Sequence, residues 1–442
     1  MGLTKNAMFV DEAIQRRRHI AVTAKSLTPA LEEFDFNVFE SVQEPAMRSS
    51  LKRKREPYAH SLSVVNDHIT AKQELIDEAS AAYEDIAYRL VSKLGWPREA
   101  IKIFPQGSAS TKTLIRTIGN LKFDIDAVCE VDISKIEAQD PMAFFDAIGT
   151  ALDGMDAVPK RRCWTINIAN KGFYLEFTPS VPLTTVLSTE SQLHRLKQAE
   201  PEFVTTALAV VDGPSKNWKT SNPAGIRDWV NRASHRTIVW EPVTEAFDSI
   251  RASVEPVATQ SVEIEETLRV AIRLFKRHRD ICVHRGYLVS ETQPISIILV
   301  TLLTTCYEGL ADLIEDGARS PFVHVVDALI ALAELLPDMI PHYPDLGYYL
   351  ANPTVVDENF AERWNTDEGE RAEAFRTWCG LLQADLVSIA ALSDPEKIMA
   401  KTLVVFGCTA AGGPSGSNGN NNSGQRVIPS APSPAPRTPG LA

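Results

Sequence analysis

Two short segments carry residue types that could handle a nucleoside triphosphate. Residues 107–113 read Gly-Ser-Ala-Ser-Thr-Lys-Thr, and further along the chain Asp124 and Asp126 are spaced i, i+2. Residues at this spacing in a β-strand point to the same face, so the two carboxylates could hold the same metal ions. A triphosphate needs hydrogen-bond donors for its oxygens and divalent cations to offset its charge. Together the two segments predict a nucleotidyltransferase site.

A third carboxylate fits the same chemistry. Residues 173–178 alternate between apolar and polar side chains, which places Glu176 on one face with Tyr174 and Thr178. On a strand next to the Asp strand, Glu176 would reach the ions held by the two aspartates and help to deprotonate an attacking hydroxyl. Two ions about 4 Å apart can hold both that hydroxyl and the leaving pyrophosphate.

Taken alone, each segment has a simpler explanation. A D-x-D pair is common on exposed strand edges, Gly-Ser dipeptides occur in most loops, and Glu176 alone is typical of a solvated position on a half-buried strand. The ordered set is more specific: a small-residue turn, a helical stretch at 113–118, the Asp strand, and an alternating strand with a central acid. It is not a Walker phosphate loop, because G-x-x-x-x-G-K-[ST] is absent from the sequence.

The elements that must position these residues follow an α+β pattern. Residues 1–50 predict short helices, and 61–94 predict one long helix because apolar positions recur at helical spacing. The expected sheet region then comprises strands at 101–104, at the Asp segment, and at 163–168 and 173–179, with a helix at 141–154. The last two strands form a hairpin around a turn rich in Asn and Gly. From residue 242 the pattern is almost wholly helical, with main helices at 262–283, 294–313, 321–335 and 360–391.

The helical half could supply the opposite wall of the site. Its first helix has an apolar stripe formed by Leu268, Ile272, Phe275 and Cys282. Lys276 and Asp280 lie four residues apart on another face, so they could pair with each other or reach a cleft. The hydroxyl of Ser296, taken alone, is typical of one that is satisfied within a buried helix.

These residues resemble a known family. The order G-S…D-x-D…[D/E] resembles the polymerase-beta-like nucleotidyltransferases, and later segments resemble the CD-NTases, bacterial relatives of cyclic GMP-AMP synthase from CBASS anti-phage signalling. Residues 273–280 resemble that family's K-x-x-R-D helix, and 294–299 its Ser-bearing helix. Two further resemblances are the "NP…EN…W" segment at 352–364 and the "P…W[FV]" element at 223–229. Together they span roughly residues 60 to 405.

The resemblance implies two lobes with a central cleft. The expected parts are a helical segment (1–60), a nucleotidyltransferase lobe with a mixed sheet flanked by helices (61–240), a helical lobe of the oligoadenylate-synthase C-terminal type (241–408), and a tail (409–442). Two Mg²⁺ ions, with Mn²⁺ as a substitute, would be the cofactors. The nucleotide-binding residues implied are Gln106, Gly107, Ser108, Lys112, Thr113, Lys276 and Ser296.

The chain departs from the family's pattern at two positions. Lys112 stands where the turn usually has a second Gly, and a Lys there could reach a phosphate but lacks the conformational freedom of Gly. The third acid is Glu176, where Asp is commoner. Neither change removes a functional group that the chemistry needs.

Composition agrees with an enzyme of the cytoplasm. The 442 residues could form two large cores, and the net charge of −12 argues against a stable nucleic-acid partner. The six scattered cysteines form no C-x-x-C pair, which suggests a reducing compartment and no zinc ribbon. We expect no membrane association, because residues 1–25 are too charged for a signal sequence and the longest apolar run, 295–303, is short.

Two basic clusters, 16–19 and 52–55, could bind nucleic acid. Their acidic neighbours favour solvated helix faces that pack across the back of the catalytic lobe.

The tail, 409–442, is rich in Gly, Ser, Asn and Pro and should be disordered. In many members of the resembled family a ubiquitin-transfer-like partner conjugates the C-terminal carboxylate, here that of Ala442. The alternative is an inert tail.

The leading hypothesis is an enzyme that joins ATP, GTP or both into a cyclic di- or trinucleotide, which switches on a separate effector during phage infection. A second hypothesis is nucleotide transfer to an RNA end or a protein side chain, which would need a more basic channel. A third is a catalytically quiet scaffold that acts through its tail.

Overall fold

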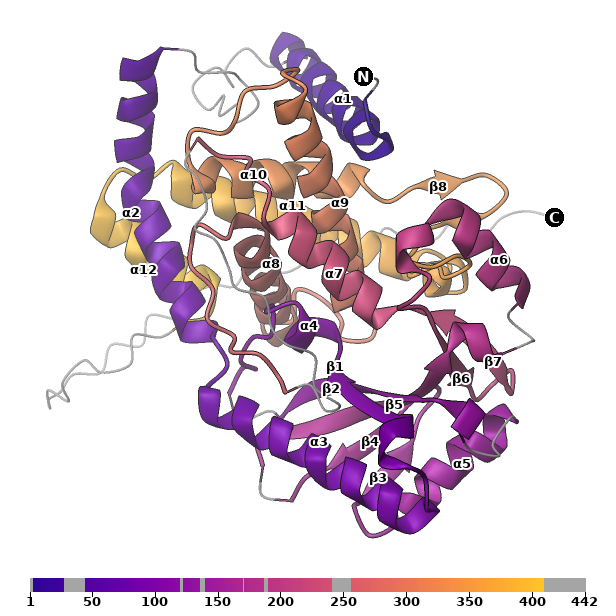
Figure 1. Cartoon of the computed structure of the whole chain (residues 1–442). Helices are drawn as coiled ribbons and strands as arrows, with labels where there is room; N and C mark the ends of the chain where they lie inside the picture. The colour runs from indigo at the N-terminus through magenta and orange to yellow at the C-terminus, as the bar shows by residue number, and fades with distance from the viewer. Residues whose placement is uncertain are drawn as a thin grey trace, which may run out of the picture. The chain divides into compact units, whose positions relative to one another are not determined.

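A computed structural model describes residues 3–27, 44–119, 122–135, 140–169, 171–186, 190–240 and 256–408 of the chain (Figure 1). Residues 1–408 form one compact unit. The tail at 409–442, with Ala442, lies outside the described residues, so its predicted disorder and conjugation stay predictions. The domain boundaries expected at 60 and 240 also stay predictions.

The fold is α+β, as expected, with a seven-stranded mixed sheet. The strands are β1 (Ile101–Pro105), β2 (Phe123–Val131), β3 (Ala157–Pro159), β4 (Trp164–Asn167), β5 (Phe173–Pro182), β6 (Leu208–Asp212) and β7 (Asn217–Ser221). Five follow the order β1-β2-β5-β4-β3, and β6 joins β7 to β5. Strands β2 and β5 are parallel, and every other pairing is antiparallel. The two strands that carry the predicted acids are therefore direct neighbours.

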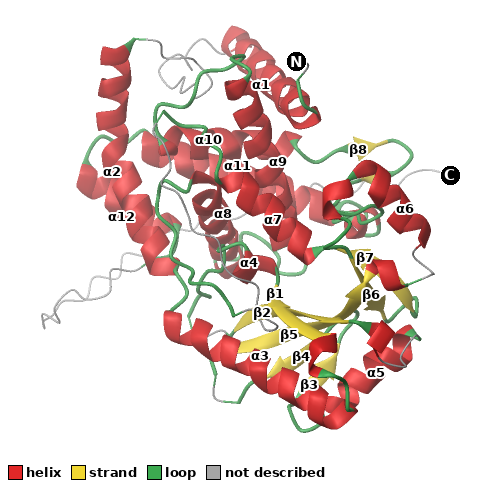
Figure 2. Ribbon diagram, in the orientation of Figure 1, coloured by secondary structure: helices red, strands yellow, loops and turns green. Residues whose placement is uncertain are grey.

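One face of the sheet is packed and the other carries the polar side chains. Ile125, Ala127, Leu175 and Phe177 are fully buried. They share a core with helices α3 (Gln73–Leu94) and α5 (Pro141–Ala151), which lie on one side of the sheet (Figure 2). Because side chains alternate along a strand, the acids between these apolar residues point away from that core.

The rest of the unit is helical and is built around α8 (Thr267–His284). Helices α2 (Pro45–Ile69), α7 (Pro223–Ser234), α9 (Ser296–Glu315), α10 (Val325–Leu335) and α11 (Glu370–Ala390) all contact it. The predicted apolar stripe of α8 is buried, but so is nearly every other residue from Thr267 to Cys282. The helix is thus a buried axis and not an amphipathic surface helix.

The two N-terminal helices pack on this helical part. Helix α1 (Lys5–Leu27) lies against α9, and α2 lies against α12 (Pro395–Val405) and α8. Arg17 pairs with Asp338 at 2.6 Å, and buried Arg55 pairs with Asp327 at 2.9 Å. The expectation that the basic clusters pack across the back of the catalytic lobe was wrong. One arginine of each cluster anchors its helix to the helical part.

Two predicted helices were wrong for one shared reason. Residues 61–94 do not form a single helix, because α2 ends at Ile69 and α3 begins at Gln73. Residues 113–118 are not helical but irregular, with a single bridge residue at Ile115. In between, Thr70 forms a β-bridge with Ile115, and the Arg116 amide donates to the Ile69 carbonyl at 2.7 Å. This tertiary pairing overrides the helical periodicity of both segments.

Other boundaries differ in detail. Helix α1 is one long helix where short ones were expected, and β6, β7 and the small hairpin of β8 (His342–Tyr343) and β9 (Gly347–Tyr348) were not predicted. The predicted first strand, the 141–154 helix and the β4–β5 antiparallel pair are confirmed.

One helix within the described ranges, α9, is long and apolar enough to cross a membrane by length and composition. The apolar stretch therefore runs further than the sequence suggested. The share of its apolar window buried inside the protein is 72%. The core helix of a globular protein passes the same test.

Candidate active site

The three predicted acids lie on one face of two neighbouring strands. In the parallel β2–β5 register, Asp124 is the partner of Tyr174 and Asp126 is the partner of Glu176. Partners in adjacent strands point to the same side of a sheet. The structure therefore brings Asp124, Asp126 and Glu176 together, with Tyr174 beside them.

Two of the acids, Asp126 and Glu176, have a raised pKa. Burial, followed by the charges of Asp124 and Glu176, raises the pKa of Asp126 to about 7. Burial and then Asp124 also raise the pKa of Glu176. No described residue donates a hydrogen bond to any of the three carboxylates or forms an ion pair with them. They are a cluster of negative charge that Lys276, acting on Asp126, and Lys160, acting on Glu176, offset only in part.

Divalent cations fit this donor set. Carboxylate oxygens are the ligands that Mg²⁺ prefers, and a cation would offset the mutual repulsion. Within the described ranges, no three Asp, Glu, His or Cys side chains are already gathered as ligands of one ion. The acids share a face without converging on a single point, as like charges do.

The Gly-Ser turn is fitted against Asp126. Residues Gly107–Ser110 form the short helix α4 directly after β1. Gly107 has a φ of +57°, and a Cβ added there would lie 2.2 Å from Asp126 Oδ2. Only Gly avoids both problems. The Gln106 amide donates to the Asp126 carbonyl at 3.0 Å, and so does the Tyr83 hydroxyl at 3.1 Å. The turn and the acid are therefore locked together.

Lys276 reaches from α8 to the turn. Its side chain is only 4% exposed, and its Nζ donates to Ser108 Oγ at 2.7 Å and to the Thr113 carbonyl at 3.0 Å. Burial, followed by the charge of Arg279, lowers the pKa of Lys276 to about 8. The alternative of a surface ion pair with Asp280 does not hold, because Asp280 pairs with Arg279 at 2.6 Å.

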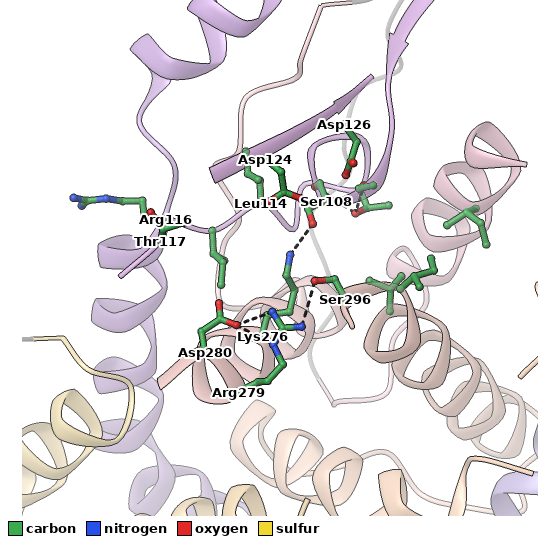
Figure 3. Close-up of a pocket in the computed structure, with 16 residues that line it drawn as sticks. Ser108, Leu114, Arg116, Thr117, Asp124, Asp126, Lys276, Arg279, Asp280 and Ser296 are labelled. Carbon is green, nitrogen blue, oxygen red and sulfur yellow. Dashed lines mark hydrogen bonds and ion pairs between the residues drawn. The ribbon is translucent and has the colours of Figure 1, made fainter. Parts of the chain in front are cut away.

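A cleft of about 840 Å³, open solvent at its mouth included, lies between these elements (Figure 3). Ser108, Asp124, Asp126, Lys276 and Ser296 line it. Its apolar lining comprises Leu114, Ile115, Ile226, Ile297 and Val300. In Figure 3, Lys276 points from α8 toward Ser108, beside the two aspartates.

Four of the predicted residues do not line this cleft. The Gln106 side chain donates to Thr178 Oγ1 on β5 at 3.2 Å. Thr113 is fully buried behind the turn. Lys112 has a φ of +58°, the left-handed conformation that the missing Gly would adopt easily. Glu176 lies on the shared sheet face next to Asp126, outside the cleft lining.

Sequence reasoning missed Arg279 as a site residue. It is 8% exposed, lines the cleft, and donates to the Pro294 carbonyl at 2.9 Å and to Ser296 Oγ at 3.3 Å. Asp280 holds its other nitrogens. The signal was present, because Arg279 follows Lys276 by three residues and shares its side of the helix. Arg116 and Thr117 also line the cleft, in the segment wrongly predicted as a helix.

A mixed sheet with three acids on two parallel neighbours, closed over by helices, defines the nucleotidyltransferase class of fold. No protein family model matches the chain. Over 271 residues it is 25% identical to a c-di-GMP synthase of Roseivirga ehrenbergii, in an alignment that covers 60% of this chain. The chain spans 61% of the length of that curated relative.

Solved structures place the fold more narrowly. The Bradyrhizobium diazoefficiens CD-NTase CdnG, in complex with GTP, is similar with a TM-score of 0.53 and 20% identity, over 79% of this chain and 99% of that one. CdnC of E. coli MS115-1, with ATP, is similar with a TM-score of 0.51 and 12% identity, over 80% and 98%. The chain has the CD-NTase fold, and the resemblance seen in the sequence is confirmed at that level.

Proposed function

We propose that this chain is a nucleotidyltransferase that joins nucleoside triphosphates into a cyclic dinucleotide, or a ring of three, and releases one pyrophosphate for each linkage. One observation carries the proposal. Asp124, Asp126 and Glu176 share one sheet face, the glycine-serine turn packs beside Asp126, and buried Lys276 of α8 donates to that turn. A triphosphate needs both features at once.

The residues of the chain would divide the work between the walls. Lys276 and Ser296 would bind the donor triphosphate from the helical side, and Ser108 and the amides of the turn would donate to its oxygens from the sheet side. Asp124, Asp126 and Glu176 would hold two Mg²⁺ ions, which when bound offset the phosphate charge and acidify the acceptor hydroxyl. Glu176, the acid nearest the β4 side of the sheet, would orient that hydroxyl.

The relatives support the substrate class. One is a c-di-GMP synthase, and the two similar structures contain GTP and ATP. We therefore propose GTP, ATP or both as substrates, and a cytoplasmic second messenger that activates a separate effector in anti-phage defence. Conjugation of the tail stays a prediction.

The test is to incubate the purified full-length chain with Mg²⁺ and labelled GTP and ATP, singly and together. We expect a small product that resists phosphatase and has the mass of a cyclic oligonucleotide. Asp126→Asn should abolish it. Glu130→Gln is a matched control, because Glu130 lies on the same strand and face but pairs with Lys102 at 3.7 Å. Label in a macromolecule would indicate terminal transfer instead, and no label in any product would contradict an enzymatic role.

A further inference from the structure

The phosphate-binding turn, residues 107–114, is held partly by its own residues, among them Thr111, whose hydroxyl donates to the Gly107 carbonyl at 3.2 Å, and partly by another segment of the chain. Helix α4 is a single turn, and the chain continues through a turn at Thr111 and Lys112 to Leu114. Within the turn, the Thr113 amide donates to the Ser108 carbonyl at 2.9 Å. The Ala109 carbonyl and the Leu114 amide, at the two ends of the bend, have no partner of this kind inside the turn and are satisfied from another segment.

That segment supplies one side chain, Gln260. Its Nε2 donates to the Ala109 carbonyl at 3.0 Å, and its Oε1 accepts from the Leu114 amide at 3.3 Å. Nε2 also donates to the Ala258 carbonyl at 2.8 Å. The three partners fix the amide orientation, since a flipped amide would set a donor against the Leu114 amide. Gln260 is only 1% exposed, so water cannot replace these bonds.

The backbone that carries Gln260 is itself anchored. Arg273 of α8 donates to the Gln260 carbonyl at 3.3 Å. The Val257 amide donates to Ser80 Oγ on α3 at 3.0 Å, and Asn66 of α2 donates to the Val262 carbonyl at 2.7 Å. Three helices therefore hold this segment against the turn.

The two ends that Gln260 joins bracket Lys112. Lys112 has a φ of +58°, which a residue with a Cβ adopts only when its surroundings enforce it. The hydrogen bonds that Gln260 forms on either side of Lys112 stabilise this conformation. They close the bend around the strained residue and keep Ser108 facing Lys276.

We infer that Gln260 is the positioning residue of the phosphate-binding turn: its buried amide fixes the bend and so sets the affinity for the nucleoside triphosphate, without touching it. This inference rests on the proposed function. The interaction acts equally before and during the reaction, so its loss should raise KM and leave kcat nearly unchanged.

The test compares Gln260→Met, which keeps the shape and removes both hydrogen-bonding groups, with the isosteric Gln260→Glu, which keeps the acceptor and removes the donor. Steady-state kinetics with GTP and Mg²⁺ should show KM raised about tenfold or more in both variants, because Glu at this position would set an oxygen against the Ala109 and Ala258 carbonyls, with kcat within about twofold. Hydrogen exchange should show faster exchange of the Leu114 amide in the Met variant and retained protection in the Glu variant.

Gln383→Met is the matched control. Gln383 also donates to a backbone carbonyl, that of Ala333 at 3.0 Å, but far from the cleft lining. Its loss should leave KM unchanged. A general loss of folding would lower kcat at constant KM, which is a different signature.

Unchanged KM in both Gln260 variants, or unchanged exchange at Leu114 in Gln260→Met, would overturn the inference. If the wild-type chain turns over no triphosphate, the proposed function fails, and the exchange arm still decides whether Gln260 shapes the turn. If the Met variant does not fold, the Glu variant gives the same kinetic decision.

Discussion

The two walls of the cleft treat charge in opposite ways. On the sheet side, Asp124 and Asp126 line the cleft and Glu176 lies beside them on the same sheet face, and burial followed by the charges of neighbouring acids raises the pKa of Asp126 and Glu176. The helix wall, α8, buries many cations, and each of Arg273, Lys276 and Arg277 donates hydrogen bonds to other groups of the protein, although Arg273 Nε has no partner among the described residues. The unpaired carboxylates are thus the candidates for binding cations, whereas the paired cations of α8 stabilise the fold.

The cations of α8 show this pairing in detail. Arg277 donates to the carbonyls of Phe406 at 2.9 Å and Gly407 at 3.1 Å. Arg273 donates to the carbonyls of Gln260 and Asn66, both at 3.3 Å. Lys276 belongs to both groups, because it donates to the turn and also faces the cleft. Arg273 and Arg277, which are held by backbone carbonyls, therefore stabilise the fold. Lys276 also lines the cleft, where it could contact a bound nucleotide.

The comparison predicts opposite effects of Asp126→Asn on activity and stability. Activity should fall by a thousandfold or more, about 4 kcal/mol in the barrier, because an ion ligand is lost. Without metal, the variant should be more stable than the wild type. A pKa raised from 3.8 to about 7 means that the folded state holds the extra proton, so wild-type stability falls as pH rises from about 4 to 7.

Thermal unfolding in EDTA at pH 5.5 and pH 8 measures this difference. The stability advantage of Asp126→Asn should be larger at pH 8. A variant less stable than the wild type at both values would show that burial and repulsion do not destabilise the charged form of Asp126.

On the helix wall, Arg277→Met should lower the free energy of unfolding by about 3 kcal/mol, because buried carbonyls lose charged donors. Arg53→Met on the exposed face of α2 should change it by less than about 0.5 kcal/mol. Urea unfolding measures both. Equal effects would mean that the buried cations do not hold the fold.

Lys276 should give the cleft a basic pH limit. Its lowered pKa of about 8 means that it loses its positive charge as pH rises through that value. The kcat/KM for the triphosphate should then fall about tenfold per pH unit above 8, and Lys276→Arg, which stays charged, should remove this fall. A wild-type profile that is flat to pH 9.5 would contradict this role.

The smallest effect concerns the turn between the walls. Lys112→Val should lower stability by about 1 to 2 kcal/mol, and Lys112→Gly should not, because of the left-handed backbone at that position. At Lys93, in the last turn of α3, the order should reverse, because Gly is the poorer residue in a helix. Differential scanning calorimetry of the four variants tests both orders. If the Val and Gly variants had the same order of stability at both positions, Lys112 would not be strained.

The features of the site that could be predicted from the sequence are those set by interactions between residues close together in the chain. The shared face of Asp124, Asp126 and Glu176 could be read from the sequence because strand alternation is local. So could the need for Gly107, since a turn before an acidic strand is a local pattern. From the sequence, Lys276 could either form an ion pair with Asp280 or reach the cleft. Only the packing of α8 decides between the two.

Longer-range effects could not be predicted. The helix break after Ile69 and the non-helical chain at Ile115 arise from one bridge between distant segments, and periodicity within either segment predicts helix. The burial of Arg273 and Arg277 runs against the polar pattern of α8. Gln260 belongs to no motif, and its role appears only when the turn is traced in three dimensions.

The passage from α2 to α3 has a mechanical consequence. Between Ile69 and Gln73 only three residues connect a helix of one wall to a helix that covers the other, and Thr70 is bridged to Ile115 at the cleft. Three extended residues span only about 10 Å. A connection of that length can act as a hinge. We therefore expect the cleft to open for nucleotide entry by rotation about Thr70, with the largest displacement at the edge of the cleft farthest from Thr70.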